Sequence, residues 1–308
     1  MRFVFHYPEL SGPDGDLLDA GDFGEVAAAA ERSGFSGISV SEHPAPGARW
    51  LASGGHQTLD PFVALAFAAA RTSRLRLLTC LAVAPYRNPA LLAKQAATLD
   101  RLSAGRLILG LGAGYQKSEF HALGVDFEER NTLFDEALDV LPLHWKGEPF
   151  SYRGTHFSAR DVQALPRPAQ DPIPVWIGGN SKLSRRRVAG RAQGWMPMAG
   201  PPRLASTART PVLTDSVAGF GAAIAELRAA ADAAGRDGQA LDVLHGYRAE
   251  GLHVPEREPE RHLAAFAELE KIGVTWTAVS VPSRSRSATV EFIEAFGETY
   301  LADGPSED

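Results

Sequence analysis

Short apolar segments alternate with longer amphipathic segments along almost the whole chain. The short segments are rich in Val, Ile, Leu and Phe, whereas the longer ones repeat their apolar residues with the period of a helix. The predicted strands are residues 2–7, 37–43, 75–84, 106–114, 175–180, 194–198, 241–249 and 274–282. The predicted helices include residues 22–35, 61–73, 88–105, 133–145 and 216–235. Strands that alternate with helices predict a parallel sheet.

Two helix starts are marked especially clearly. Asp60 and Asn88 each precede a proline, so a capping side chain stands before a residue suited to the first helical position. Eight parallel strands are the number that closes a (β/α)8 TIM barrel, and 308 residues lie within the range of one such domain. We therefore predict a single barrel domain over residues 1–308. An open doubly wound sheet is the alternative, but G-x-G-x-x-G does not follow the first predicted strand.

Two stretches punctuated by Pro and Gly interrupt the alternation, at about 147–174 and 199–216. They stand before and after the fifth and sixth predicted strands. Because long loops in barrels usually cover the active-site face, we predict insertion loops at the carboxyl face and read 199–216 as part of a substrate lid. A surface excursion without function is the alternative.

Composition narrows the classes of partner. The formal net charge is −6, which gives no electrostatic footprint for nucleic acid or an anionic membrane, and no apolar run is long enough to span a bilayer. Cys80 is the only cysteine, so an internal disulfide is excluded, in keeping with a cytoplasmic location. No H-x-H, H-E-x-x-H or C-x-x-C spacing occurs, and we predict no metal site.

Polar and glycine residues gather where the predicted strands end, and barrel enzymes carry their catalytic residues there. These strand ends hold His6, Tyr7, Ser41, Glu42, His43, Thr79, Cys80, Gly112, Gly114, Tyr115, Gly178, Gly179, Asn180, Ser181, His245 and Tyr247. From position alone, His43 is either catalytic or a donor to a neighbouring carbonyl group. Cys80 reads as a small buried apolar residue. His253 and His262 lie in a charged segment that predicts a solvated surface.

Three stretches resemble the luciferase-like flavin- or deazaflavin-dependent oxidoreductases, and within them the F420-dependent subfamily. They are "GISVSEH" at the end of the second strand, residues 85–130, and "PVWIGGNS" with the "RRRVAGRAQGWMPM" that follows. The middle stretch is the most specific, because a helix, a glycine-rich strand end and "EF", "LG", "F" and "R" occur in order. The resemblance covers nearly the whole chain and implies a (β/α)8 barrel with a flavin-type cofactor at its carboxyl face.

The resemblance also implies roles for single residues. A bulge at Cys80, Leu81 and Ala82 would press on the cofactor, with a cis peptide bond between Cys80 and Leu81. His43 would face the reacting edge of the cofactor and serve as the catalytic proton donor or hydrogen-bond donor. Gly112 and Gly114 would leave room for a flat ring.

Other residues complete this expected site. Some sugar-phosphate-oxidising relatives carry a carboxylate directly after the glycines of the fourth strand, where this chain has Tyr115, which would shape the pocket. The "GGNS" run Gly178, Gly179, Asn180 and Ser181 would bind the cofactor's phosphate at a helix N-terminus. Arg185 to Arg187 either assist an anionic tail or form a solvated helix face. Glu119 and Arg130 read as a structural ion pair or as loop fasteners.

The favoured function is hydride transfer between coenzyme F420 and a small organic substrate. An FMNH2-dependent monooxygenase is the alternative, because both chemistries use the same barrel. A second alternative is a relative that binds a cofactor without catalysis, since a fold does not fix a function. A homodimer is common in the family, but no residue pattern identifies its interface.

Overall fold

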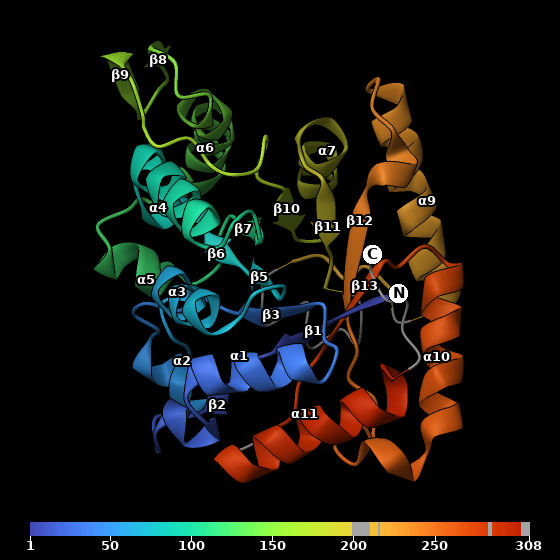
Figure 1. Ribbon diagram of the computed structural model, residues 1–308. Coiled ribbons are helices and arrows are strands. Elements are labelled where there is room, and N and C mark those ends of the chain that lie inside the picture. The colour runs from blue at the N-terminus through green and yellow to red at the C-terminus, as the bar shows by residue number, and fades with distance from the viewer. Residues whose placement is uncertain (199–209, 215, 283–284, 303–308) are drawn as a thin grey trace.

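Eight parallel strands form a closed barrel in the computed structural model, which describes residues 1–198, 210–214, 216–282 and 285–302 (Figure 1). Each strand pairs with its neighbour in chain order, and the ring closes where the last strand pairs with the first. The barrel strands are β1 (Arg2–His6), β3 (Gly37–Val40), β5 (Arg76–Thr79), β7 (Leu107–Gly112), β10 (Val175–Gly178), β11 (Gly194–Met196), β12 (Asp242–Gly246) and β13 (Trp276–Val279). The structure confirms the predicted TIM barrel.

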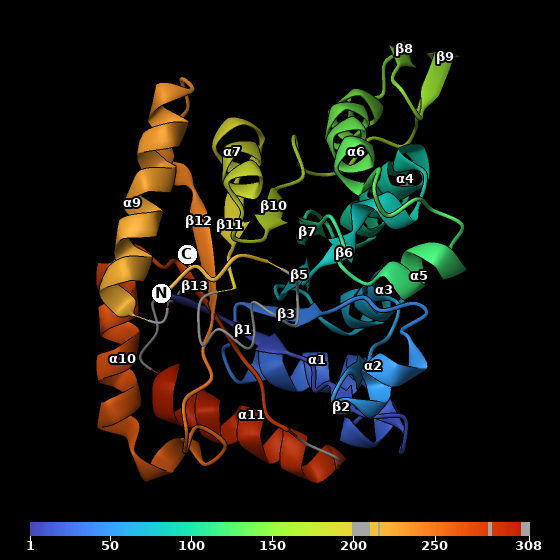
Figure 2. The ribbon, with the colours of Figure 1, turned by 180° about the vertical axis from the view of Figure 1, so that it is seen from behind.

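Helices surround these strands, as the two opposite views show (Figures 1 and 2). They are α1 (Phe23–Arg32), α3 (Pro61–Arg71), α4 (Pro89–Leu102), α6 (Arg130–Trp145), α7 (Lys182–Arg191), α9 (Val217–Ala233), α10 (Pro259–Lys271) and α11 (Arg286–Tyr300). The two predicted caps are confirmed. The Asp60 carboxylate accepts hydrogen bonds from the N–H groups of Phe62 and Val63, and the Asn88 side chain accepts one from Ala90.

Helix α10 corrects the prediction for His262. The charged sequence around His262 predicts a solvated surface, but the His262 side chain is fully buried. His262, Phe266 and Leu269 recur at helical spacing on the buried side of α10, and the Tyr247 hydroxyl lies 2.8 Å from His262 Nδ1. His262 is therefore buried because it lies on the apolar face of α10, although most of its neighbours in the sequence are charged.

Several short elements lie between the barrel strands and the main helices. They are α2 (Ala48–Ala52), α5 (Lys117–Ala122), the antiparallel pair β2 (Leu10–Ser11) and β4 (His56–Gln57), and β6 (Ala82–Val83) beside β7. The part of the chain that the structure describes also contains four 3-10 turns, η1 (Leu17–Ala20), η2 (Ala84–Tyr86), η3 (Gly238–Ala240) and η4 (Pro255–Arg257). The predicted strand 75–84 is thus divided into β5 and β6. The peptide bond between Cys80 and Leu81 at this break is cis, as the resemblance implies.

The segment 147–174 lies at the amino ends of the barrel strands, not at the carboxyl face as predicted. It contains the hairpin of β8 (Phe150–Arg153) and β9 (Ser158–Val162), at the outer end of α6 (Figure 2). Its Gln170 side chain accepts from Arg76 and donates to the Leu107 carbonyl, at the starts of β5 and β7. The reason is connectivity, because a helix-to-strand connection reaches a barrel from its amino end.

Most of the predicted lid, 199–216, falls outside the described residues, so the lid remains a prediction. The described part of this segment includes Thr210, Pro211 and Thr214, which line the cavity described below.

Two main layers and a small third cluster of Val83, Tyr86 and Phe120 form the core of the described residues. The larger layer lies between the strands and the surrounding helices. The smaller one fills the barrel interior and consists of Val4, Leu78, Ile108, Trp176, Met196, Leu244 and Trp276. Cys80, Leu81 and Ala278 pack against the interior cluster, so a ligand has room only beyond the carboxyl ends of the strands.

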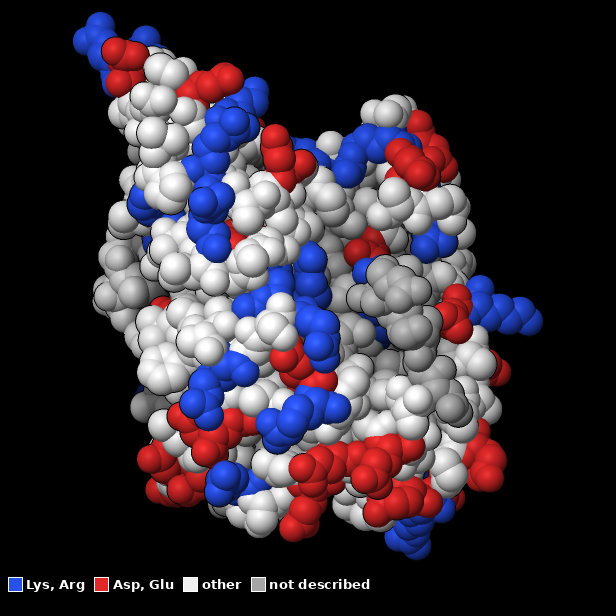
Figure 3. All heavy atoms as spheres, in the orientation of Figure 1, with Lys and Arg blue, Asp and Glu red and all other residues white. Residues whose placement is uncertain are grey.

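The surface carries charges of both signs. Figure 3 shows acidic side chains gathered along the lower part of one face and basic side chains above them. Among the described helices, none is both long enough and apolar enough to cross a membrane.

Candidate active site

A cavity of about 850 Å³ opens at the carboxyl ends of the strands. All eight barrel strands contribute to its wall, directly or through the residues that follow them. Its size is within the range of small-molecule and cofactor sites. The predicted site residues that line it are His43, Cys80, Leu81, Gly112, Gly114, Tyr115, Gly178, Gly179 and Ser181.

The structure does not bring Ala82 and Asn180 to the cavity wall. Ala82 is fully buried in β6, where it pairs with Leu111 of β7. The Asn180 amide donates to the carbonyls of Met198 and Pro211, and its backbone N–H donates to Thr210 Oγ1. Asn180 therefore fastens the chain on either side of residues 199–209, and its hydrogen-bonding groups are already used.

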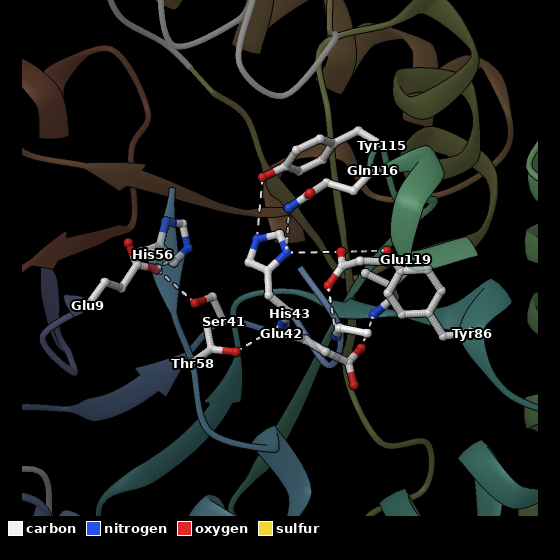
Figure 4. Close-up of polar contacts among 12 residues, drawn as sticks. Glu9, Ser41, Glu42, His43, His56, Thr58, Tyr86, Tyr115, Gln116 and Glu119 are labelled. Atoms are coloured by element: carbon white, nitrogen blue, oxygen red, sulfur yellow. Dashed lines mark hydrogen bonds and ion pairs between the residues drawn. The ribbon is translucent and has the colours of Figure 1, made fainter. Parts of the chain in front are cut away.

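His43 is held by a buried carboxylate from α5 (Figure 4). Its Nδ1 lies 3.0 Å from Oε2 of Glu119, whose side chain has no exposed surface. Glu119 also accepts hydrogen bonds from the Tyr86 hydroxyl at 2.9 Å and from the Ala45 N–H at 3.3 Å. These bonds satisfy the carboxylate and fix the plane of the imidazole ring.

The proton on His43 follows from these contacts. The Gln116 amide nitrogen lies 3.0 Å from the same Nδ1, which cannot donate to Glu119 and accept from Gln116 at once. The carboxylate is the stronger partner, so we assign the proton to Nδ1, where it is donated to Glu119. This assignment leaves the lone pair on Nε2.

Tyr115 lies on the Nε2 side of His43. Its hydroxyl is 3.3 Å from Nε2, and the two rings meet edge to face. Burial and the nearby charges of Glu119 and Glu9 raise the pKa of Tyr115 well above its usual value, so the hydroxyl keeps its proton and acts as a donor. The Trp50 ring, 4.7 Å from the imidazole between centroids, covers another side of His43.

Of the two predicted roles for Glu119 and Arg130, the ion pair is wrong and the loop fastener fits, because both side chains bond to the backbone of loops. The two residues do not form an ion pair with each other within the described chain, because Glu119 contacts His43 while Arg130 donates to the Phe127 carbonyl. The short helix α5, which the sequence pattern did not predict, turns Glu119 toward the end of β3. Glu119 is therefore a hydrogen-bond partner of His43 in the cavity wall.

A second polar cluster converges on one oxygen of Glu9. Its Oε1 lies 3.1 Å from His6 Nε2, 2.7 Å from Ser41 Oγ and 3.2 Å from His56 Nε2. Burial alone would lower the pKa of His6, but its hydrogen bonds to Cys80 and Glu9 outweigh burial and raise the pKa to about 10. Burial opposes the ionised form of Glu9, yet the bond and charge of His6 hold its pKa well below the usual range. His6 and Glu9 therefore form an ion pair in the cavity wall.

Leu81 occupies the space that the glycines of two strands leave open. A Cβ atom added to Gly112 would lie 2.9 Å from Leu81 Cδ1, and one added to Gly178 would lie 2.5 Å from it. Gly114 has a φ of +78°, and a Cβ there would lie 2.7 Å from Val83. The predicted room beside these glycines is thus filled by the protein's own side chains, and Gly112 and Gly178 act by placing Leu81.

The end of β10 leads into a well-capped helix. The Ser181 hydroxyl accepts the Ser184 N–H at 3.0 Å, and Gly179 turns the chain with a φ of +101°. Of the two predictions for Arg187, the solvated helix face is wrong, because the side chain is buried and makes a two-point ion pair with Asp135. That pair joins α7 to α6, so Arg187 is already neutralised within the protein. Arg187 also lines the cavity, so its assistance to an anionic tail stays a prediction.

A family model for luciferase-like monooxygenases matches residues 1–249. The chain belongs to this family. An uncharacterized protein of Mycobacterium tuberculosis is 32% identical over 286 residues, which cover 87% of this chain and 90% of the relative. An F420-dependent glucose-6-phosphate dehydrogenase of Microbacterium testaceum is 31% identical over 218 residues, which cover 69% of this luciferase-like chain and 61% of the relative.

Solved structures share the fold of this luciferase-like protein. The monooxygenase RslO1 from Streptomyces bottropensis superposes with a TM-score of 0.74 at 20% identity and covers 98% of this chain and 99% of its own. An F420-dependent secondary alcohol dehydrogenase, solved with an F420-acetone adduct, gives 0.73 at 17% identity, with 97% and 98% covered. The family and its relatives place the protein among oxidoreductases and monooxygenases.

Sequence reasoning missed Glu9 and His56, which lie on the short segments around β2 and β4. Glu9 stands three residues after His6, but this spacing alone marks no site, and no spacing links His56 to either residue. The described residues place no three His, Cys, Asp or Glu side chains together in a way that could hold a metal ion.

Proposed function

We propose that this protein is an oxidoreductase that transfers hydride between coenzyme F420 and a small organic substrate. One observation carries the proposal. His43 presents Nε2 to a large cavity while its Nδ1 is fixed by the buried carboxylate of Glu119. A base held in this way suits a proton transfer that accompanies hydride transfer. The F420-dependent relative and the F420-dependent structural neighbour support the choice of cofactor.

The cavity wall fits a flat ring system. Leu81, Met196, Leu244 and Ala278 line it with apolar side chains above the filled barrel interior. A Cβ on Gly178 would displace Leu81, so the glycine preserves the surface on which a ring would rest. When bound, F420 would supply a two-electron hydride acceptor or donor at its ring.

The end of β10 fits the phosphate of such a cofactor. Gly178, Gly179 and Ser181 line the cavity, and the N-terminus of α7 follows them directly. The first N–H groups of a helix have no acceptor within the helix, and its dipole favours an anion there. We propose that these residues hold the phosphate, without the side chain of Asn180.

His43 would then exchange the proton of the reaction. With its proton on Nδ1, the ring accepts a proton at Nε2 and becomes an imidazolium that Glu119 stabilises. In the opposite direction, the imidazolium returns that proton to the substrate. Trp50 and Tyr115 limit the directions from which a substrate reaches Nε2.

An FMNH2-dependent monooxygenase is the second candidate function. It is supported by structural neighbours that are monooxygenases, RslO1 among them.

A homodimer also remains a proposal. Val63 and Phe67 on α3 are 61% and 59% exposed, and apolar side chains of this kind are available for a contact between two copies.

Titration of the purified protein with F420 and, separately, with FMN tests the cofactor. Fluorescence should report saturable binding of F420. Micromolar affinity for FMN without binding of F420 would overturn the proposal in favour of the monooxygenase. Tight F420 binding without turnover of any substrate class would favour a non-catalytic relative.

A further inference from the structure

Tyr115 is placed over His43 by the turn at the end of β7. Gly114 adopts a left-handed φ of +78°, and a Cβ on it would meet Val83 at 2.7 Å and Phe120 at 2.8 Å. A side chain is therefore excluded at residue 114, and the chain turns so that the next residue points back into the cavity. Figure 4 shows the hydroxyl of Tyr115 directed at the His43 ring.

The contact between the two side chains is long. Tyr115 Oη and His43 Nε2 are 3.3 Å apart, beyond the usual length of a hydroxyl hydrogen bond. Both groups line the cavity. The hydroxyl is a donor, because its pKa is raised, and Nε2 is an acceptor, because the proton lies on Nδ1. A substrate oxygen that accepts a hydrogen bond from Tyr115 and donates one to His43 Nε2 would satisfy both groups. The hydroxyl group of an alcohol can do both.

We propose that Tyr115 donates a hydrogen bond to the substrate oxygen that exchanges its proton with His43, and that the substrates are alcohols or the corresponding carbonyl compounds. This inference rests on the proposed F420-dependent function. It assigns Tyr115 to the substrate rather than to the cofactor.

The reaction balances with oxidised F420 as the electron acceptor. In the oxidation of an alcohol, the C–H bond would break, and bound oxidised F420 would accept its hydride. The O–H bond breaks and its proton goes to His43 Nε2, and the carbon–oxygen double bond forms. Tyr115 keeps its own proton throughout and donates to the oxygen before and after the step. The reduction of a carbonyl compound by reduced F420 follows the same steps in reverse.

Tyr115 also distinguishes this chain from the relatives that carry a carboxylate at this point. A carboxylic acid can release a proton to the substrate, whereas a phenol with a raised pKa only donates a hydrogen bond. His43 is then the single group that transfers the proton. Tyr115 lowers the energy of the negative charge that builds up on the substrate oxygen as the proton leaves.

Tyr115→Phe tests the inference in the F420-loaded enzyme. The probes are isopropanol and cyclohexanol with oxidised F420, and acetone and cyclohexanone with reduced F420. We expect kcat to fall about 10²-fold, as for the loss of one donor to a developing oxyanion, while F420 affinity stays unchanged. Tyr152→Phe is the matched control, because it removes a hydroxyl bonded to Asp139 outside the cavity and should leave kcat unchanged.

The other possible outcomes test F420 binding, the substrate class and the role of Tyr115 separately. Absence of F420 binding would contradict the proposed function itself. Binding of F420 without turnover of any of these four probes would overturn the assignment of alcohols and carbonyls. Equal kcat for wild type and Tyr115→Phe, with turnover present, would overturn the role of Tyr115 alone.

A measurement without substrate checks the contact on which the inference stands. Nitrogen NMR of histidine-labelled protein should show that the Nε2 resonance of His43 moves in Tyr115→Phe but stays in place in Tyr152→Phe. An unmoved resonance in Tyr115→Phe would show that the hydroxyl does not reach Nε2 in solution.

Discussion

The two halves of the cavity wall differ in chemistry. The half built on β1, β3, β5 and β7 carries two linked polar clusters, one around Glu119 and one around Glu9. The half built on β10, β11, β12 and β13 is lined largely by glycine and apolar residues, including Gly178, Met196, Leu244 and Ala278. One half is therefore suited to proton transfer, and the other to holding a flat molecule by shape.

Two histidines show why this division arises. His6 and His245 both stand at strand ends and both line the cavity. Contacts with Cys80 and Glu9 raise the pKa of His6 to about 10, against the effect of its burial. His245 lacks a carboxylate partner within the described chain, and burial lowers its pKa to about 4. A partner carboxylate, more than the histidine itself, thus decides which of the two histidines carries charge.

The largest expected effect comes from removing the base of the polar half. His43→Ala should lower kcat about 10³-fold, because general base catalysis typically contributes this much, while F420 binding remains. His245→Gln is the control in the opposite half and should keep most of the activity. Steady-state kinetics with the alcohol probes measure both variants. Full kcat in His43→Ala would exclude His43 as the proton acceptor.

Glu119→Gln should have the next largest effect. The amide keeps the volume of the side chain but no longer fixes the proton on Nδ1, so we expect kcat to fall about 10²-fold with little change in KM. Nitrogen NMR should also show a mixture of His43 tautomers. Glu136→Gln is the matched control, since Glu136 is a buried carboxylate that accepts the N–H groups of Thr155 and Phe157 on the remote hairpin. Equal losses in the two variants would point to general destabilisation.

Gly178→Ala tests the half that binds by shape. The added Cβ would lie 2.5 Å from Leu81 Cδ1 and push that side chain toward the ring, so F420 affinity should fall about tenfold. Gly246→Ala is the control, because Gly246 lines the same cavity and a Cβ there meets nothing within 4 Å. Fluorescence titration gives both dissociation constants. Equal affinities would show that Leu81 does not set the shape of the binding surface.

The smallest expected effect concerns stability and its dependence on pH. The pKa of His6 is raised in the folded protein from 6.5 to about 10, so its charge stabilises the fold fully below pH 6.5 and this contribution is lost as the pH rises through 10. His6→Gln should therefore lower the free energy of unfolding by about 2 kcal/mol at the acid end of this range and much less near pH 10.

Urea unfolding across this range measures the His6 effect. His156→Gln is the control, because it removes a histidine–glutamate contact outside the cavity, with Glu129, and such exposed pairs contribute little. A difference between wild type and His6→Gln that does not change with pH would contradict the ion pair with Glu9.

The barrel could be predicted because strand and helix periods are local properties of the chain. Each of the eight predicted strands overlaps an observed barrel strand, and the cap residues Asp60 and Asn88 start the helices that they predict. His262 shows the limit of this reasoning. Its neighbours are charged, but its place on the apolar face of α10 buries it.

The site could be predicted only in part, because some of its residues are placed by packing between separate loops. The rule that strand ends meet at one face brought His43, Cys80 and Tyr115 to the cavity. Glu9 and Glu119 follow no strand directly, and their positions depend on how the segments after β1 and β7 pack against other loops. Glu119 lies 76 residues along the chain from His43, and Glu9 is likewise distant from His56, so these contacts leave no periodic trace in the sequence.

Cys80 has a practical consequence for work on this protein. It is the only cysteine of the chain, and it lies partly exposed in the cavity wall, beside the break between β5 and β6. A small alkylating reagent such as iodoacetamide would therefore label a single, known position. Because anything that fills the cavity shields this thiol, the rate of labelling reports occupancy without a substrate, a coupled assay or a tag.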